Sequence, residues 1–96
     1  MPTPSIDFET FRDDMLAAGY ETVLQRVWAP GALTGIHTHP FEADALVVQG
    51  QMWLTEQGGP TCALQAGDRF HLLAMVPHEE RYGPQGATYW VARRPA

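Results

Sequence analysis

The spacing of apolar residues along this chain changes at Gly19. Before Gly19, apolar residues recur at intervals of three and four, which is the spacing of one face of a helix. They are Phe8, Phe11, Met15 and Ala18. The spacing predicts a helix over about residues 7–18, with Ser5 or Asp7 as its N-cap and Gly19 just after its end. We expect this apolar stripe to pack on the rest of the domain, with docking onto a second subunit as the alternative.

From residue 20 onward, polar and apolar residues alternate in short runs, as they do in β-strands. The expected strands are residues 20–28, 35–39, 43–49, 51–56, 61–64, 68–74, 79–82 and 88–93. Gly and Pro separate most of these runs, most clearly at Gly58-Gly59-Pro60. Runs of this number and spacing predict an all-β sandwich or barrel. The sequence contains no internal repeat, so we expect one domain over residues 1–96 with a barrel over residues 20–93.

The charge balance argues against partners that carry many phosphates. The chain has six basic and eleven acidic side chains, a formal net charge of −5, and no basic cluster beyond Arg93-Arg94. Nucleic acids and anionic membranes attract basic surfaces, so we expect neither as a partner. No apolar run approaches the roughly 20 residues that cross a membrane, and the N-terminus shows no export signal. A single cysteine, Cys62, fits a reducing, cytoplasmic setting.

His37 and His39 are the strongest candidates for chemistry in this sequence. Residues at i and i+2 of a strand project from the same face, so the two imidazoles can bind one metal ion. His78, in a later strand-like segment, can supply a third ligand. His71 alternates with two apolar residues that we expect in the core. It is therefore predicted to lie at the surface or at a subunit contact, outside the site.

The spacing around these histidines resembles the two motifs of the cupin family, whose members are small jelly-roll barrels with a metal in the mouth. The first motif is Gly, five residues, His-x-His, three or four residues, Glu, six residues, Gly. The second is Gly, five residues, Pro-x-Gly, two residues, His. The matching positions are Gly31, His37, His39 and Gly50 in the first motif and Gly67 and His78 in the second. The resemblance implies a cupin jelly-roll barrel of about seven or eight short antiparallel strands with one N-terminal helix.

The chain departs from the first motif where the family places its acidic ligand. That position is Ala43, with acids on either side at Glu42 and Asp44. Strand parity turns Ala43 toward the barrel and both acids away from it. Pro40 lacks an N–H and so predicts a bulge after His39, which would redirect Glu42. We therefore expect Glu42 as the fourth ligand, with an open site of three histidines and water as the alternative.

The second motif departs from the family at three positions and adds two candidate residues. Leu73 and Met75 replace its Pro and Gly, and Tyr82 stands where Asn often occurs. His78, Glu80 and Tyr82 alternate, so they share one face of a strand. An inward Glu80 is a metal ligand, a partner for a histidine N–H, or a general base, and the alternative is a rim charge paired with an arginine. We predict Glu80 and Tyr82 as catalytic residues, with Tyr82 orienting substrate; the alternative is that Tyr82 only packs in the wall.

Three neutral imidazoles with an optional carboxylate suit Zn, Fe, Mn, Ni or Cu, so the sequence predicts a divalent transition metal without naming it. The leading hypothesis is an enzyme that acts on a small organic molecule. Cupins also serve as effector-binding modules, so the alternative is a non-catalytic sensor that binds a small molecule. A third hypothesis is an interaction domain in which the histidines are vestiges. The small barrel with its apolar helix favours a homodimer.

Overall fold

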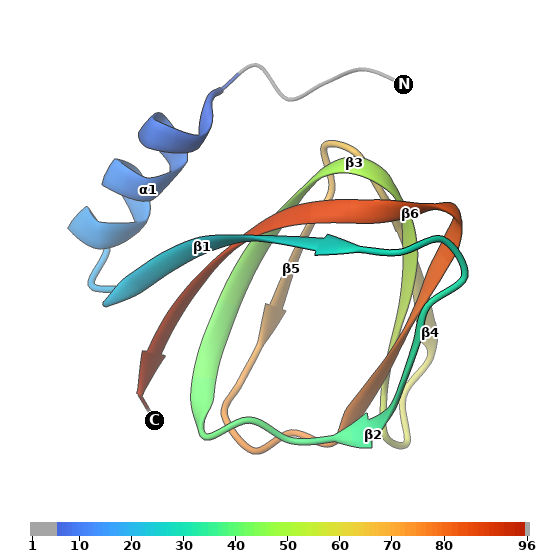
Figure 1. Ribbon diagram of the computed structural model, residues 1–96. Coiled ribbons are helices and arrows are strands. Elements are labelled where there is room, and N and C mark those ends of the chain that lie inside the picture. The colour runs from blue at the N-terminus through green and yellow to red at the C-terminus, as the bar shows by residue number, and fades with distance from the viewer. Residues whose placement is uncertain (1–5, 96) are drawn as a thin grey trace.

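The computed structural model of the protein describes residues 6–95 (Figure 1). Within this range, one helix, α1 (Phe8–Ala17), precedes six β-strands. The strands are β1 (Thr22–Trp28), β2 (Leu33–His37), β3 (Phe41–Glu56), β4 (Thr61–Gln65), β5 (Arg69–Leu72) and β6 (His78–Pro95). All of the strand pairs are antiparallel. The all-β fold with one N-terminal helix that the sequence predicts is confirmed.

The helix begins and ends at the signals in the sequence. The Asp7 carboxylate caps it by accepting a hydrogen bond of 2.8 Å from the backbone N–H of Thr10. This bond lowers the pKa of Asp7. Gly19 follows the last turn with a φ of +102°, a conformation that glycine adopts without steric cost. Ser5, the other predicted cap, lies outside the described residues.

β3 and β6 are long strands that run the full length of the one six-stranded sheet that forms the barrel. Residues 41–50 of β3 pair with β5 and with the C-terminal half of β6, which also pairs with β1. Residues 51–56 of β3 pair with β4 and with the N-terminal half of β6, which also pairs with β2. The strands surround a central space that side chains fill, and α1 lies outside it (Figure 1). This is the arrangement of a jelly-roll barrel.

Gly50 and Gly86 explain why six strands form where seven or eight are predicted. A β-carbon on Gly50, whose φ is +81°, would lie 2.1 Å from the carbonyl oxygen of Gly86. A β-carbon on Gly86, whose φ is +72°, would lie 2.2 Å from the carbonyl oxygen of Trp28. Because only glycine allows this approach, β3 and β6 bend at these residues and continue. The breaks that the sequence predicts between strands, at Gly50 and after residue 82, are therefore bends within long strands.

Apolar side chains pack on both faces of the sheet that contains β1. Inside the barrel, the buried cluster consists of Ala43, Ala45, Val47, Met52, Leu54, Leu64, Leu72, Tyr82, Ala87, Tyr89 and Val91. On the outer face, side chains of α1 and of the sheet form a second buried cluster. Its members are Phe11 and Met15 of the helix, with Tyr20, Leu46, Trp90 and Ala92. The apolar stripe of the helix thus packs on the domain itself. Among the described residues, no helix has the length and apolar character needed to cross a membrane.

Candidate metal centre

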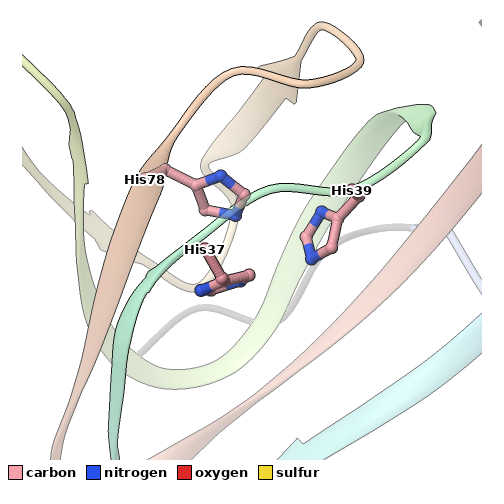
Figure 2. Close-up of side chains that lie close together, drawn as sticks. All are labelled: His37, His39 and His78. Atoms are coloured by element: carbon pink, nitrogen blue, oxygen red, sulfur yellow. The ribbon is translucent and has the colours of Figure 1, made fainter.

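Three histidine side chains from separate segments point toward one another (Figure 2). His37 ends β2, His39 lies in the connection to β3, and His78 begins β6, where it is the register partner of His37. One ring nitrogen from each histidine lies within 4.8 Å of those of the other two. The antiparallel pairing of β2 with β6 therefore brings together the trio that the sequence predicts.

Backbone carbonyls orient two of these rings so that their Nε2 atoms are free. The Nδ1 of His37 lies 2.7 Å from the carbonyl oxygen of Gly35, and the Nδ1 of His78 lies 2.9 Å from that of Val76. A carbonyl only accepts, so Nδ1 carries the proton in each neutral ring and Nε2 keeps its lone pair. His78 is 1% exposed, and its Nε2 has no hydrogen-bond partner among the described residues. This buried, unpaired nitrogen fits a metal ligand.

His39 is held in the neutral form that binds metals. Its ring stacks on Phe41, with centroids 4.7 Å apart and planes 4° from parallel. Burial first, and the neighbouring imidazoles of His78 and His37 second, lower the pKa of His39 to about 4. Since metals bind the deprotonated imidazole, a ring that is neutral near pH 7 needs no proton loss to become a ligand.

Glu80 is the carboxylate that the fold brings to the histidines. Its Oε2 lies 3.6 Å from Nε2 of His37 and 3.7 Å from Nε2 of His78, and its side chain is 6% exposed. Its other oxygen, Oε1, accepts a hydrogen bond of 2.5 Å from the hydroxyl of Tyr82. Burial raises the pKa of Tyr82, so this hydroxyl stays protonated and donates. Glu80 is therefore a buried carboxylate beside the histidines, not the paired rim charge that was the alternative.

Comparisons with known proteins agree with this geometry. Neither protein-family models nor curated proteins give a match, but solved structures do. One is a chain from the crystal structures of the DMSP lyases RdDddP and RnDddQII, with 27% identity and a TM-score of 0.71 over 77% of this chain and 38% of that one. Another is an RmlC-like cupin from Shewanella frigidimarina, with 25% identity and a TM-score of 0.68 over 78% and 66%.

A cupin-like protein from Thermotoga maritima matches with 28% identity and a TM-score of 0.63 over 73% of this chain and 54% of that one. The chain belongs to the cupin superfamily. It spans less than two thirds of the length of each of these three structures. The resemblance inferred from the histidine motifs, and the jelly-roll barrel that it implies, are thereby confirmed.

Glu42 does not lie at the histidines of this cupin, which corrects the prediction that it is the fourth ligand. Ala43 is buried in the barrel, and Glu42 lies on the opposite face of β3. There its Oε1 accepts a hydrogen bond of 2.7 Å from Nε of Arg94, and its Oε2 pairs with His71. The bond from Arg94 first, and that from His71 second, lower the pKa of Glu42. The proline after His39 thus leaves strand parity unchanged, so Glu42 still faces outward.

His71 lies outside the site, as predicted. It is exposed, and it pairs with Glu42 on the outer surface of the cupin barrel. Asp44, the other acid beside Ala43, pairs there with Arg69 at 3.0 Å. Both acids that flank the expected ligand position are therefore neutralised outside the barrel, and the carboxylate beside the histidines comes from β6.

Met75 has a role that the sequence does not reveal. It stands at the glycine position of the second cupin motif and adopts a φ of +64°, in the left-handed region. A residue with a β-carbon pays roughly 1–2 kcal/mol there. Its backbone N–H donates a hydrogen bond of 2.8 Å to the carbonyl of His39. This bond connects the loop before His78 to the segment that carries the other two histidines.

The tryptophans differ in location. Trp28 lies inside, stacked on Tyr82 with ring centroids 4.8 Å apart, whereas Trp90 lies under α1 and contacts Phe11. A surface groove of about 1080 Å³ is lined by residues of β1, β3, β4 and β6. None of the predicted site residues lines it. The site is therefore defined by its unpaired polar groups and not by the size of a surface groove.

Proposed function

We propose that this cupin is a metal-dependent enzyme that acts on a small organic molecule at the three histidines. The observation that supports this most strongly is the position of Glu80. It is a buried carboxylate within 3.7 Å of two imidazole nitrogens, one of which is buried and unpaired. Buried polar groups without partners are rare in folded proteins, and they concentrate where a ligand or a reaction uses them.

His37, His39 and His78 would hold a divalent transition metal, which when bound would polarise an oxygen atom of the substrate. The donor set is consistent with zinc, iron, manganese, nickel or copper. The similarity to a structure of DMSP lyases supports a catalytic use of this barrel. We do not infer the substrate from that similarity, since this chain spans only 38% of the chain it matches.

Glu80 would accept or return the proton in this reaction. Its Oε1 is occupied by the Tyr82 hydroxyl, which leaves Oε2 as the basic atom on the side of the histidines. Tyr82 stays protonated and donates to Glu80, so it is a positioning residue that fixes the carboxylate. This role differs from the sequence prediction, in which Tyr82 orients the substrate itself.

Two Glu→Gln variants test the proposal, one beside the histidines and one on the outer surface. Metal content is measured first, by elemental analysis of protein purified without a His tag, and turnover of small organic molecules is then screened. Glu80→Gln should retain metal and reduce turnover by about 10²–10⁴-fold, the usual contribution of a general acid or base. The matched control is Glu42→Gln on the outer surface, which should change turnover less than about twofold.

Three outcomes would overturn this assignment in whole or in part. A metal-loaded protein that binds metabolites and consumes none would be a sensor, the alternative that the sequence leaves open. Protein that holds no metal, and shows no thermal shift when metal is added, would carry its histidines as vestiges. Equal turnover by Glu80→Gln and wild type would remove Glu80 from the chemistry.

Homodimerisation stays a prediction. Four apolar side chains on β2 and on the loop before β6 are more than half exposed, which supports burial against a second copy. They are Leu33, Ile36, Leu73 and Met75. Light scattering at micromolar concentration should give the mass of two chains, and a monomeric mass would contradict the prediction. The net charge of −5 continues to argue against nucleic acid as a partner.

A further inference from the structure

The positive side chains of this protein fall into two groups. All six basic residues are arginines. Three form ion pairs on the outside of the molecule: Arg12 with Asp13, Arg69 with Asp44 and Arg94 with Glu42. Arg81 is exposed and lies over the ring of Trp53. The other two, Arg26 and Arg93, are partly buried and have no carboxylate partner among the described residues.

Strand alternation directs Arg26 and Arg93 to the inside of the barrel. Arg26 stands between Leu24 and Trp28 on β1, and both of these pack on the inner cluster. Arg93 follows Val91 of the same cluster by two residues on β6. Residues two apart on a strand share a face. Because β1 and β6 are neighbours in the sheet, both guanidinium groups belong to one wall of the interior.

Arg93 packs on Phe41, the ring that also stacks on His39. Its guanidinium carbon lies 4.6 Å from the ring centroid of Phe41, which stacks on His39. The Nε of Arg93 is buried and has no hydrogen-bond partner among the described residues. Burial first, and the charge of Arg26 second, lower the pKa of Arg93. The second cause means that the two positive charges repel one another across the interior.

Arg26 likewise packs on an aromatic ring, that of Trp28, which leads to Glu80 through Tyr82. Its guanidinium carbon lies 4.9 Å from the ring centroid of Trp28, and Trp28 stacks on Tyr82, the donor to Glu80. The two arginines therefore lie against the aromatic rings that pack on His39 and on Tyr82.

Two unpaired arginines inside the barrel of a protein with a net charge of −5 require an explanation. Partly buried charges without partners are costly, because no neighbouring carboxylate compensates for the hydration that they lose. A bound anion would remove this cost. The planar guanidinium fork matches the two oxygens of a carboxylate, and the flanking rings of Trp28 and Phe41 offer apolar walls to the remainder of an organic acid.

We propose that Arg26 and Arg93 bind the carboxylate of the substrate, so that this site takes a small organic acid. The inference rests on the proposed function and narrows its substrate class. With the carboxylate held between the two guanidinium groups, the rest of the molecule extends toward Glu80 and the three histidines. The arginines thereby orient the acid, and Glu80 exchanges a proton with the part of the acid that lies beside it.

Side-chain NMR tests this directly, because six arginines give six Nε–H signals. The full chain is labelled with ¹⁵N and titrated with propionate and with its uncharged isostere propionamide, as purified and again after chelation. Propionate should shift the signals of Arg26 and Arg93, and propionamide should shift neither. Arg93→Gln should weaken propionate binding by about tenfold or more, the effect expected for loss of a charged hydrogen bond. The matched control, Arg81→Gln on the outside, should change binding less than twofold.

Several results would overturn the inference. These are equal shifts with propionamide, unchanged affinity in Arg93→Gln, or tighter binding of inorganic phosphate than of propionate at the same two signals. Circular dichroism verifies that Arg93→Gln folds, and Arg26→Gln serves as the second variant if it does not. Because propionate binding is measured without metal, its failure is distinct from failure of the metal site, which elemental analysis detects.

Discussion

Two histidine–glutamate pairs of this cupin lie in opposite environments. On the outer surface, His71 pairs with Glu42, and Arg94 donates to the same carboxylate at 2.7 Å. Inside the barrel, Glu80 lies 3.7 Å from a His78 that is 1% exposed. The outer pair has a cation to balance its carboxylate and water to solvate both partners. The inner pair has only the neutral hydroxyl of a tyrosine and leaves an imidazole nitrogen unpaired.

The difference teaches that residue types alone do not mark the site. Both pairs have the same chemical groups, but only one is incomplete. A complete, exposed ion pair contributes little beyond a small stabilisation. A buried polar group without a partner costs free energy that a ligand can return on binding. The incomplete pair is therefore the one from which we expect chemistry.

The largest effect should come from exchanging one histidine of each pair for alanine. His78→Ala removes one of three imidazoles and should weaken metal binding by about 100-fold or more, since even residues that only support a ligand account for 10–100-fold. His71→Ala should leave the metal stoichiometry at the wild-type value. Elemental analysis after dialysis measures both variants.

Thermal unfolding with added zinc distinguishes loss of the site from loss of the fold. A folded His78→Ala protein should show a normal transition that zinc no longer shifts, whereas zinc should still raise the transition of His71→Ala. Retention of stoichiometric metal by His78→Ala would mean that the inner pair is not part of a metal centre.

The sequence predicts which side chains face the barrel and which face outward, because the alternation of side chains along a strand is a local property. Parity predicts that His37 and His39 share a face and that Glu80 shares one with His78, and the spacing of the second cupin motif adds His78 to the pair. The same parity turns Glu42 outward. The mistaken preference for Glu42 came from expecting Pro40 to redirect it, yet the structure keeps the alternation.

The remainder depends on pairing between distant strands, which periodicity does not reveal. That Arg94 meets Glu42 follows from the register of β3 with β6. The bends at Gly50 and Gly86 depend on close approach of two backbones. Each glycine is visible in the sequence as a turn signal, but only the fold shows that the strand continues through it.

A smaller effect should follow from removing one hydroxyl on each side of the sheet. Tyr82→Phe deletes the donor to a buried carboxylate and should lower the free energy of unfolding by about 1.5–3 kcal/mol, the range for hydrogen bonds to charged groups. The matched variant Tyr20→Phe lies on the outer face, where its hydroxyl makes no hydrogen bond to the described residues. It should change stability by less than about 0.5 kcal/mol.

Urea unfolding of both tyrosine variants, with metal content measured in parallel, checks this prediction. Tyr82→Phe should retain its metal, because the hydroxyl supports Glu80 and not the histidines. Equal stability of the two variants would show that the bond from Tyr82 to Glu80 contributes nothing, and the contrast between the inner and outer faces would then be confined to the histidines.

The smallest effect concerns pH and the outer pair. The hydrogen bond from Arg94, and then that from His71, lower the pKa of Glu42 in the folded protein. A carboxyl with a lowered folded pKa stabilises the fold above its unfolded pKa, and this contribution disappears as the pH falls through the folded value. In wild type, the urea midpoint should therefore include a decrease from Glu42 below about pH 4.5.

Three variants separate the causes of this pH dependence. Glu42→Gln should remove that part of the decrease, and Arg94→Gln should remove most of it, because the bond from Arg94 is the larger cause. His71→Ala should remove less. If His71→Ala instead flattened the curve more than Arg94→Gln, the outer carboxylate would depend mainly on its histidine. The outer pair would then resemble the inner one, and the balancing arginine could no longer account for the difference between them.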